Sequence, residues 1–177
     1  MDLNDVKFLD HVRFEDNRGY FEDLFYHETV HDFVIESIKR SYSPTRYTVR
    51  GLHFQFPPFA QAKWVRCTSG SIFDVVVDLR VNSSSFGKSK CFLLNNLDCR
   101  SLFIPKGFAH GFMTLQNDVE VVYAVDNVYA PDHEGVILWN DVSLKIDWPV
   151  MQPMKISDKD SCGMTFDACK SVLENMK

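Results

Sequence analysis

Several features that would place a protein in a broad class are missing from this sequence. The 177 residues contain no apolar run of membrane-spanning length, and the first ten, MDLNDVKFLD, lack the pattern of a signal peptide. The five cysteines are odd in number and scattered, with no C-x-x-C pair, which argues against a disulfide framework or a zinc site. The net charge of -5 argues against broad nucleic-acid binding. These absences predict a cytoplasmic protein with reduced thiols that binds neither nucleic acid nor a membrane.

Three common catalytic signatures are also missing. The segment FGKS (86–89) matches the end of a phosphate-binding loop, but Asn82 stands where the first glycine belongs. No G-x-S-x-G motif is present, so a serine hydrolase has no support. A metal-binding β-helix usually needs two histidines one residue apart with an acid and a third histidine. Here LHFQ offers His53 alone, and the next candidate is His110. We therefore expect no metal ion.

The remaining pattern is that of a β protein. Short runs rich in β-branched and aromatic residues recur at about ten-residue spacing, with turn residues between them, which predicts a sandwich or barrel. The expected strands lie at 71–80, 90–96, 101–105, 111–116, 120–129 and 135–140. A short helix is expected within 27–41, and the tail 165–177 places apolar residues at helical spacing. The length and the absence of linkers predict one domain over 1–177.

The segment VRGLHFQFPPFAQAKWVRC (49–67) carries many polar side chains for buried sheet. Its polar members are Arg50, His53, Gln55, Gln61, Lys63 and Arg66. His53 and Gln55 alternate, so both face one side of a strand, and the Pro-Pro turn is expected to return the chain beside it. A single histidine is more often structural, but clustered cations repel one another unless an anion binds. The cluster predicts a barrel interior that holds an anionic ligand.

The order of several segments is specific. It runs FEDNRGYFEDLF (14–25), RGLHFQFPPFAQAKWVR, DVVVDLR, SSSFGK, IPKGFAHGF, VVYAVDNVYAP, GVILWNDVSLKIDWP and SDKD (157–160). In these segments the chain resembles the dTDP-4-dehydrorhamnose 3,5-epimerases, which act on nucleotide-linked 4-keto-6-deoxysugars. The resemblance implies an all-β cupin-type jelly roll (double-stranded β-helix) with a few short helices, one of them C-terminal. It also implies a homodimer without a cofactor, a nucleotide-diphosphate sugar as substrate, and a place in deoxysugar and surface-polysaccharide (lipopolysaccharide) biosynthesis.

The resemblance also implies residue roles. His53 matches the catalytic base, and Asp160 matches the acid that orients it. Tyr123 matches the proton donor on the opposite face, and Lys63 matches the cation near the C4 oxygen. The positions implied to bind substrate are Arg18, Phe21, Asp23, Arg50, Gln55, His110 and Tyr129.

The chemistry explains these residue types. A ketone at C4 acidifies the hydrogens on C3 and C5, because the carbanion delocalises into an enolate. A neutral imidazole suits a base near pH 7, and a carboxylate behind it fixes its tautomer. General acid–base catalysis of this kind contributes roughly 10²–10⁴-fold. A fixed cation stabilises the enolate oxygen, and inversion needs a proton from the other face. No metal, nicotinamide or flavin is required.

The chain departs from the family pattern in the residues expected to contact the sugar. A Gln-x-Asn pair is common in the strand before RGLH, and an ungapped count places Ile38 and Arg40 there. Ala124 and Val128 stand where a lysine and a tyrosine are usual. Inversion of one centre, or of a CDP- or GDP-linked 4-keto sugar, therefore stays open. So do a nucleotide-sugar 3,4-ketoisomerase and a non-catalytic sugar-binding cupin, although RGLHFQ and SDKD argue against the first and the retained catalytic residues against the second.

Overall fold

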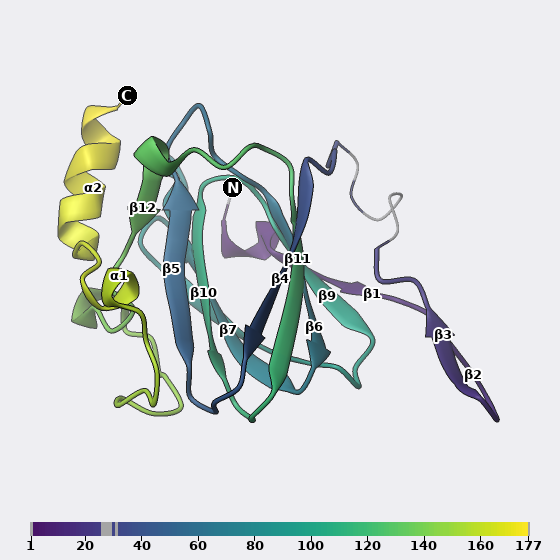
Figure 1. The fold of residues 1–177 in the computed structure, drawn as a ribbon. Helices are drawn as coiled ribbons and strands as arrows, with labels where there is room; N and C mark the ends of the chain where they lie inside the picture. The colour runs from purple at the N-terminus through teal and green to yellow at the C-terminus, as the bar shows by residue number, and fades with distance from the viewer. Residues whose placement is uncertain (1, 26–29, 31, 177) are drawn as a thin grey trace.

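Two antiparallel sheets of five strands face each other in the computed structural model, which describes residues 2–25, 30 and 32–176 (Figure 1). The first sheet has the order β1 (Lys7–Asp10), β9 (Arg100–Ile104), β6 (Lys63–Ser69), β11 (Val119–Val125) and β4 (Ser37–Ser43). The second has the order β12 (Glu134–Val136), β5 (Val49–Gln55), β10 (Phe108–Thr114), β7 (Ser71–Asp78) and β8 (Ser89–Asn95). Neighbouring strands in both sheets pair antiparallel. The prediction of an all-β sandwich or barrel is confirmed.

The second sheet is buried on both faces, which explains the nearly continuous apolar run of β7. Ile72 and Val76 pack between the sheets with Val65 and Leu102 of the first sheet. The alternate residues of β7 pack on the other face of the sheet, against Trp139, Trp148 and the C-terminal segment. Burying both faces of the sheet anchors the cavity wall that β5 and β10 form.

Short helices complete the fold, as expected. They are η1 (Leu3–Asp5), η3 (Pro131–His133), η4 (Val142–Leu144), α1 (Asp158–Ser161) and α2 (Phe166–Asn175). Helix α2 confirms the predicted C-terminal helix: the Thr165 side chain caps its first turn, and Phe166 and Cys169 are buried against the second sheet. In the described part of the chain, no helix is both long and apolar enough to cross a bilayer.

Two predicted elements need correction. The helix expected within 27–41 is wrong where the structure describes it, because residues 37–41 belong to β4, which pairs along its whole length with β11. Residues 27–29 and 31 lie outside the described residues. The strand expected at 135–140 ends at Val136, because Leu138 leaves the sheet and donates its N–H to Met164 of the C-terminal segment.

The Pro-Pro turn after β5 has a different outcome from the one expected. It does not return β6 beside β5. Instead the chain crosses to the opposite sheet, where β6 pairs with β9 and β11. His53 and Lys63, only ten residues apart, therefore approach the interior from two different sheets.

A two-stranded hairpin, β2 (Arg13–Asp16) and β3 (Gly19–Glu22), projects from the body as an arm (Figure 1). Its base is fixed at Glu22, whose carboxylate accepts from Arg13 at 2.8 Å and pairs with buried Arg66 at 2.8 Å. Strand β3 leaves Tyr20 and Phe21 57% and 69% exposed. A rigidly based arm with uncovered aromatic rings is typical of a contact surface.

Candidate active site

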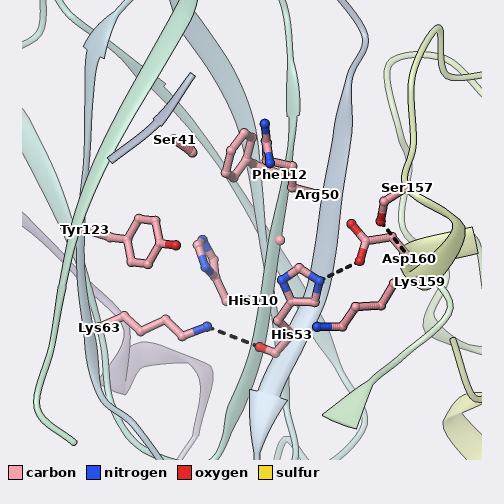
Figure 2. A pocket seen from close by; sticks show the side chains of 11 residues that line it. Ser41, Arg50, His53, Lys63, His110, Phe112, Tyr123, Ser157, Lys159 and Asp160 are labelled. Atoms are coloured by element: carbon pink, nitrogen blue, oxygen red, sulfur yellow. Dashed lines mark hydrogen bonds and ion pairs between the residues drawn. The ribbon is translucent and has the colours of Figure 1, made fainter. Parts of the chain in front are cut away.

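A cavity of about 230 Å³ lies between the sheets, and the clustered polar residues of 49–67 contribute to it (Figure 2). Its wall includes Arg50, His53, Lys63, His110, Tyr123 and Asp160. An adjoining cavity of about 350 Å³ shares His53, Lys63 and Tyr123 and extends to Lys39, Gln55, Gln61, Tyr129 and Glu134. The three shared residues therefore lie at the junction of two hollows.

His53 and Asp160 form an imidazole–carboxylate pair. His53 Nε2 lies 2.7 Å from Asp160 Oδ1, and because the carboxylate only accepts, Nε2 donates and Nδ1 is left toward the cavity (Figure 2). The other Asp160 oxygen accepts from the Gly51 N–H at 3.1 Å. Burial alone would raise the pKa of Asp160, but the hydrogen bond and charge of His53 and the Gly51 and Ser157 contacts hold it below its ordinary value. The pair is thus an ionised carboxylate behind a base whose free nitrogen faces the cavity.

Lys63 places a cation at the same wall. Its ammonium donates to the His53 carbonyl at 3.2 Å, which bridges the two sheets. Burial lowers the pKa of Lys63 to about 8, an effect that the charges of Asp74 and Glu134 partly oppose. At neutral pH the side chain is mostly charged, and it can release its proton at a modestly higher pH.

A second imidazole–carboxylate pair lies beside Lys63. His110 Nε2 is 2.8 Å from Asp74 Oδ2, and Asp74 is fully buried on β7. The other oxygen, Asp74 Oδ1, is buried without a hydrogen-bond partner among the described residues. Asp74 therefore fixes the orientation of the His110 ring, and its charge opposes the effect of burial on the pKa of Lys63.

Tyr123 stands on the opposite wall from His53. It comes from β11 of the first sheet, and Figure 2 shows its hydroxyl pointing across the cavity. Burial raises the pKa of the Tyr123 phenol, so it is a proton donor at neutral pH. A base and a phenolic acid thus flank one cavity from opposite sides.

The second hollow is lined by groups that bind one another. Glu134 accepts from the Tyr129 hydroxyl at 2.7 Å and from the Lys159 ammonium at 2.5 Å. These contacts lower the pKa of Glu134 against the raising effect of its burial. The Gln55 side-chain N–H donates to the carbonyls of Phe59 and Val128. Gln55 therefore shapes the wall rather than offering its N–H groups to the cavity.

The family model of dTDP-4-dehydrorhamnose 3,5-epimerase matches residues 1–168. The chain belongs to this epimerase family. It is 41% identical over 169 residues to the dTDP-4-dehydrorhamnose 3,5-epimerase of Shigella flexneri, with 93% of each chain covered.

Solved structures support the same family. The dTDP-4-dehydrorhamnose 3,5-epimerase of Bacillus anthracis with TDP and PPi bound matches with a TM-score of 0.89 at 39% identity, covering 93% of this chain and 96% of that one. A 3'-monoepimerase from Streptomyces bikiniensis in complex with dTDP-quinovose matches with a TM-score of 0.87 at 28% identity, covering 94% and 86%. The predicted cupin-type jelly roll and membership of the epimerase family are confirmed.

The structure brings together eight of the eleven predicted site residues of this epimerase-family chain. They are Arg50, His53, Gln55, Lys63, His110, Tyr123, Tyr129 and Asp160. Arg18, Phe21 and Asp23 lie on the projecting arm or directly after it, and the Arg18 side chain is 85% exposed. Neither hollow is lined by these three residues.

Two expectations about individual side chains are wrong. Arg66 does not join the cavity cations, because it lies three residues after Lys63 on β6, faces the other side, and binds Glu22 at the base of the arm. Ile38 is 65% exposed on the outer face of β4, and Arg40, on that same face, pairs with Glu120. The ungapped count is thus one residue out of phase, and Lys39 and Ser41 face the cavities in place of the Gln-x-Asn pair.

Four further residues at the site were not singled out in the sequence. Glu134 and Lys159 form the pair beside the dyad, and the Ser157 hydroxyl accepts from the Asp160 N–H at 3.1 Å at the start of α1. Lys159 lies inside the SDKD segment itself, and this position was the signal in the sequence that could have identified it as a site residue. Asp74 binds His110, whereas Asp78 of the same strand binds Arg80. Ala124, which stands where a lysine is usual in the family, packs outside the cavity with Trp64.

Proposed function

We propose that this protein, acting as one epimerase-type domain, inverts C5, C3 or both in a dTDP-linked 4-keto-6-deoxyhexose, without a cofactor. The observation that carries the proposal is the placement of His53 and Tyr123 on opposite sides of one cavity that also contains the Lys63 ammonium. Inversion at carbon needs a base on one face of the ring and a proton donor on the other. This cavity supplies both, with a cation for the intermediate.

The reaction follows from these positions. His53 Nδ1 removes the proton from the carbon beside the C4 ketone, and the electron pair moves onto the C4 oxygen. Asp160 stabilises the imidazolium that results. Lys63 stabilises the enolate oxygen. Tyr123 then gives a proton to the opposite face of the same carbon. The phenolate regains a proton from solvent, and the imidazolium releases one.

The nucleotide part is supported by the cations and the ring at the mouth of the site. Arg50 is held toward the cavity by Ser43 Oγ at 3.1 Å and the Tyr42 carbonyl at 2.9 Å. Tyr129 offers a half-exposed ring on the rim of the second hollow. A diphosphate suits the guanidinium, and a base can stack on the phenol ring. The relative from B. anthracis with TDP and PPi bound supports the same class of ligand.

We propose a homodimer in which the arm of one copy completes the site of the other. Arg18, Phe21 and Asp23 match substrate-binding positions of the family, yet they lie on or directly after an arm that projects away from the cavities (Figure 1). The exposed rings of Tyr20 and Phe21 give that arm an aromatic surface that a second copy would cover. In a dimer, Arg18, Phe21 and Asp23 of one copy would reach the cavity of the other copy.

A single-centre epimerase is the second candidate. The observation in its favour is that Lys39 and Ser41 occupy the cavity face of β4, so the wall that meets the substrate differs from the usual amide pair. The similar S. bikiniensis protein is a monoepimerase, and the shared fold serves either outcome.

Solvent exchange tests the proposal directly. The protein is incubated with a dTDP-4-keto-6-deoxyglucose in deuterium oxide, and deuterium at C3 and C5 is followed separately by NMR. Deuterium incorporation with inversion at both carbons supports a 3,5-epimerase. Incorporation with inversion at one carbon alone supports a single-centre epimerase. If no deuterium enters either position of the dTDP, CDP or GDP sugars, the proposed epimerase function is wrong.

A further inference from the structure

Strand β4 turns one face toward the cavities, and that face carries two polar side chains with no role in proton transfer. Exposure alternates along the strand, so Ile38, Arg40 and Tyr42 face outward. Lys39 lines the second hollow and Ser41 lines the first. In the ladder, Lys39 lies directly opposite Tyr123 of β11. The inward face of β4 therefore adjoins the proposed proton donor.

Both side chains lack protein partners. Ser41 Oγ is buried with no hydrogen bond, and Lys39 has no ion pair or hydrogen bond, within the part of the chain that the structure describes. Most buried polar groups in native proteins are paired, so an unpaired hydroxyl in a cavity wall points to a ligand. Lys39 is only partly buried, but it lies two residues from Ser41 on the same face of the strand, so one ligand can contact both side chains.

The carboxylate and amides around Lys39 are already engaged. Glu134 accepts from Lys159 and Tyr129. The Gln61 side chain donates to the carbonyls of Asn127 and Val128, as Gln55 does to its own loop. Among the described residues, the Lys39 ammonium therefore has no carboxylate partner on the cavity wall. Lys63, by contrast, has the buried Asp74 carboxylate nearby.

Resting on the proposed function, we propose that Lys39 is a substrate-binding residue whose ammonium binds the diphosphate of the substrate, with the Ser41 hydroxyl left to the adjoining sugar. The diphosphate is the only permanent anion of a neutral 4-keto-6-deoxysugar nucleotide. An unpaired ammonium in the wall of its cavity is the group that such an anion stabilises. Lys39 thereby orients the substrate for His53 and Tyr123 without taking part in the chemistry.

Calorimetric titration of the full-length protein with nucleoside diphosphates tests this assignment. Wild type and Lys39→Gln are titrated with dTDP, CDP and GDP, which carry the same diphosphate. Loss of one charged contact is expected to weaken the binding of the preferred nucleotide by about tenfold or more. Lys39→Arg should restore most of the affinity. In turnover, Lys39→Gln should raise KM and leave kcat nearly unchanged, because the contact is made equally in ground and transition states.

Arg40→Gln is the matched control, since it removes the same charge from the next residue on the outer face, where Arg40 pairs with Glu120 at 3.8 Å. Its affinity should stay at the wild-type value. If Lys39→Gln binds the preferred diphosphate as tightly as wild type, or if Arg40→Gln loses as much affinity, the assignment of Lys39 is overturned while the epimerase stands. If wild type binds none of the three nucleotides, the assignment of Lys39 is also overturned, and deuterium exchange into the sugar nucleotides decides separately whether the epimerase function stands.

Discussion

His53 and Tyr123 reach one cavity from opposite sheets, His53 from β5 and Tyr123 from β11. A planar enolate between them would present one face to the imidazole and the other to the phenol. The sandwich architecture itself therefore separates removal of the proton from its return.

Removing each of the two groups should give different products. His53→Ala should abolish both solvent exchange and inversion, because it removes the imidazole that takes the proton in the proposed reaction. Tyr123→Phe keeps the ring but loses the proton, so His53 can still deprotonate C5 and return deuterium to the same face. NMR in deuterium oxide should show incorporation with retention, faster than epimerisation.

Tyr42→Phe is the control for Tyr123→Phe, because its hydroxyl binds exposed Asp118 outside the cavity. It should invert at the wild-type rate. Inversion by Tyr123→Phe at that same rate, or exchange by His53→Ala, would show that the two roles are misassigned.

Asp160→Asn should lower kcat less than His53→Ala does. The amide cannot stabilise the imidazolium, and it can favour the tautomer that leaves no lone pair on Nδ1. Steady-state kinetics should show the loss mainly in kcat, since Asp160 lies behind His53. A variant with wild-type kcat would mean that the 2.7 Å pair is structural only.

The activity should fall at high pH as Lys63 loses its proton. Because burial lowers the pKa of Lys63 to about 8, its charge is present below that pH and lost as the pH rises through it. The profile of kcat/KM against pH should therefore have a descending limb near pH 8. Lys63→Arg, whose guanidinium stays charged, should shift or remove this limb, even with a lower kcat. A wild-type profile flat to pH 10 would contradict the charged role.

The homodimer and its exchanged arm predict complementation. Light scattering at micromolar concentration should give twice the chain mass of 20.5 kDa. His53→Ala should be inactive alone, and Arg18→Ala should be weakly active alone. After mixing and subunit exchange, hybrid dimers with one intact site should recover part of the activity. A monomer by light scattering, or a mixture no more active than its components, would argue against a shared site.

Turnover should survive exhaustive treatment with EDTA. His53 and His110 each commit one ring nitrogen to a carboxylate, and Lys63 supplies the positive charge that the enolate needs. The rate after chelation and dialysis should equal that before it. Loss of activity that zinc or manganese restores would require a different account of enolate stabilisation.

Local patterns in the sequence determined much of this protein. The β-branched runs, the turn residues and the apolar spacing of 166–176 predict the strands and the last helix, because both periodicities depend on near neighbours. The roles expected of residues 53, 63, 123 and 160 followed from the resemblance to the epimerase family rather than from any local periodicity. Strand β4 was missed because its alternation of exposed and inward residues includes polar side chains on both faces.

Only the tertiary structure decided how these residues meet. His53 and Asp160 are 107 residues apart, and their contact depends on the C-terminal segment folding back over the second sheet. The direction of the Pro-Pro turn, across the sandwich rather than along it, brought Lys63 to the cavity from the opposite sheet. Strand alternation then turned Arg66, three residues further on, to the other face, where it binds Glu22. On β4, a difference of one residue exchanged Ile38 and Arg40 for Lys39 and Ser41. Successive side chains of a strand point to opposite faces, so only the observed pairing with β11 could assign that register.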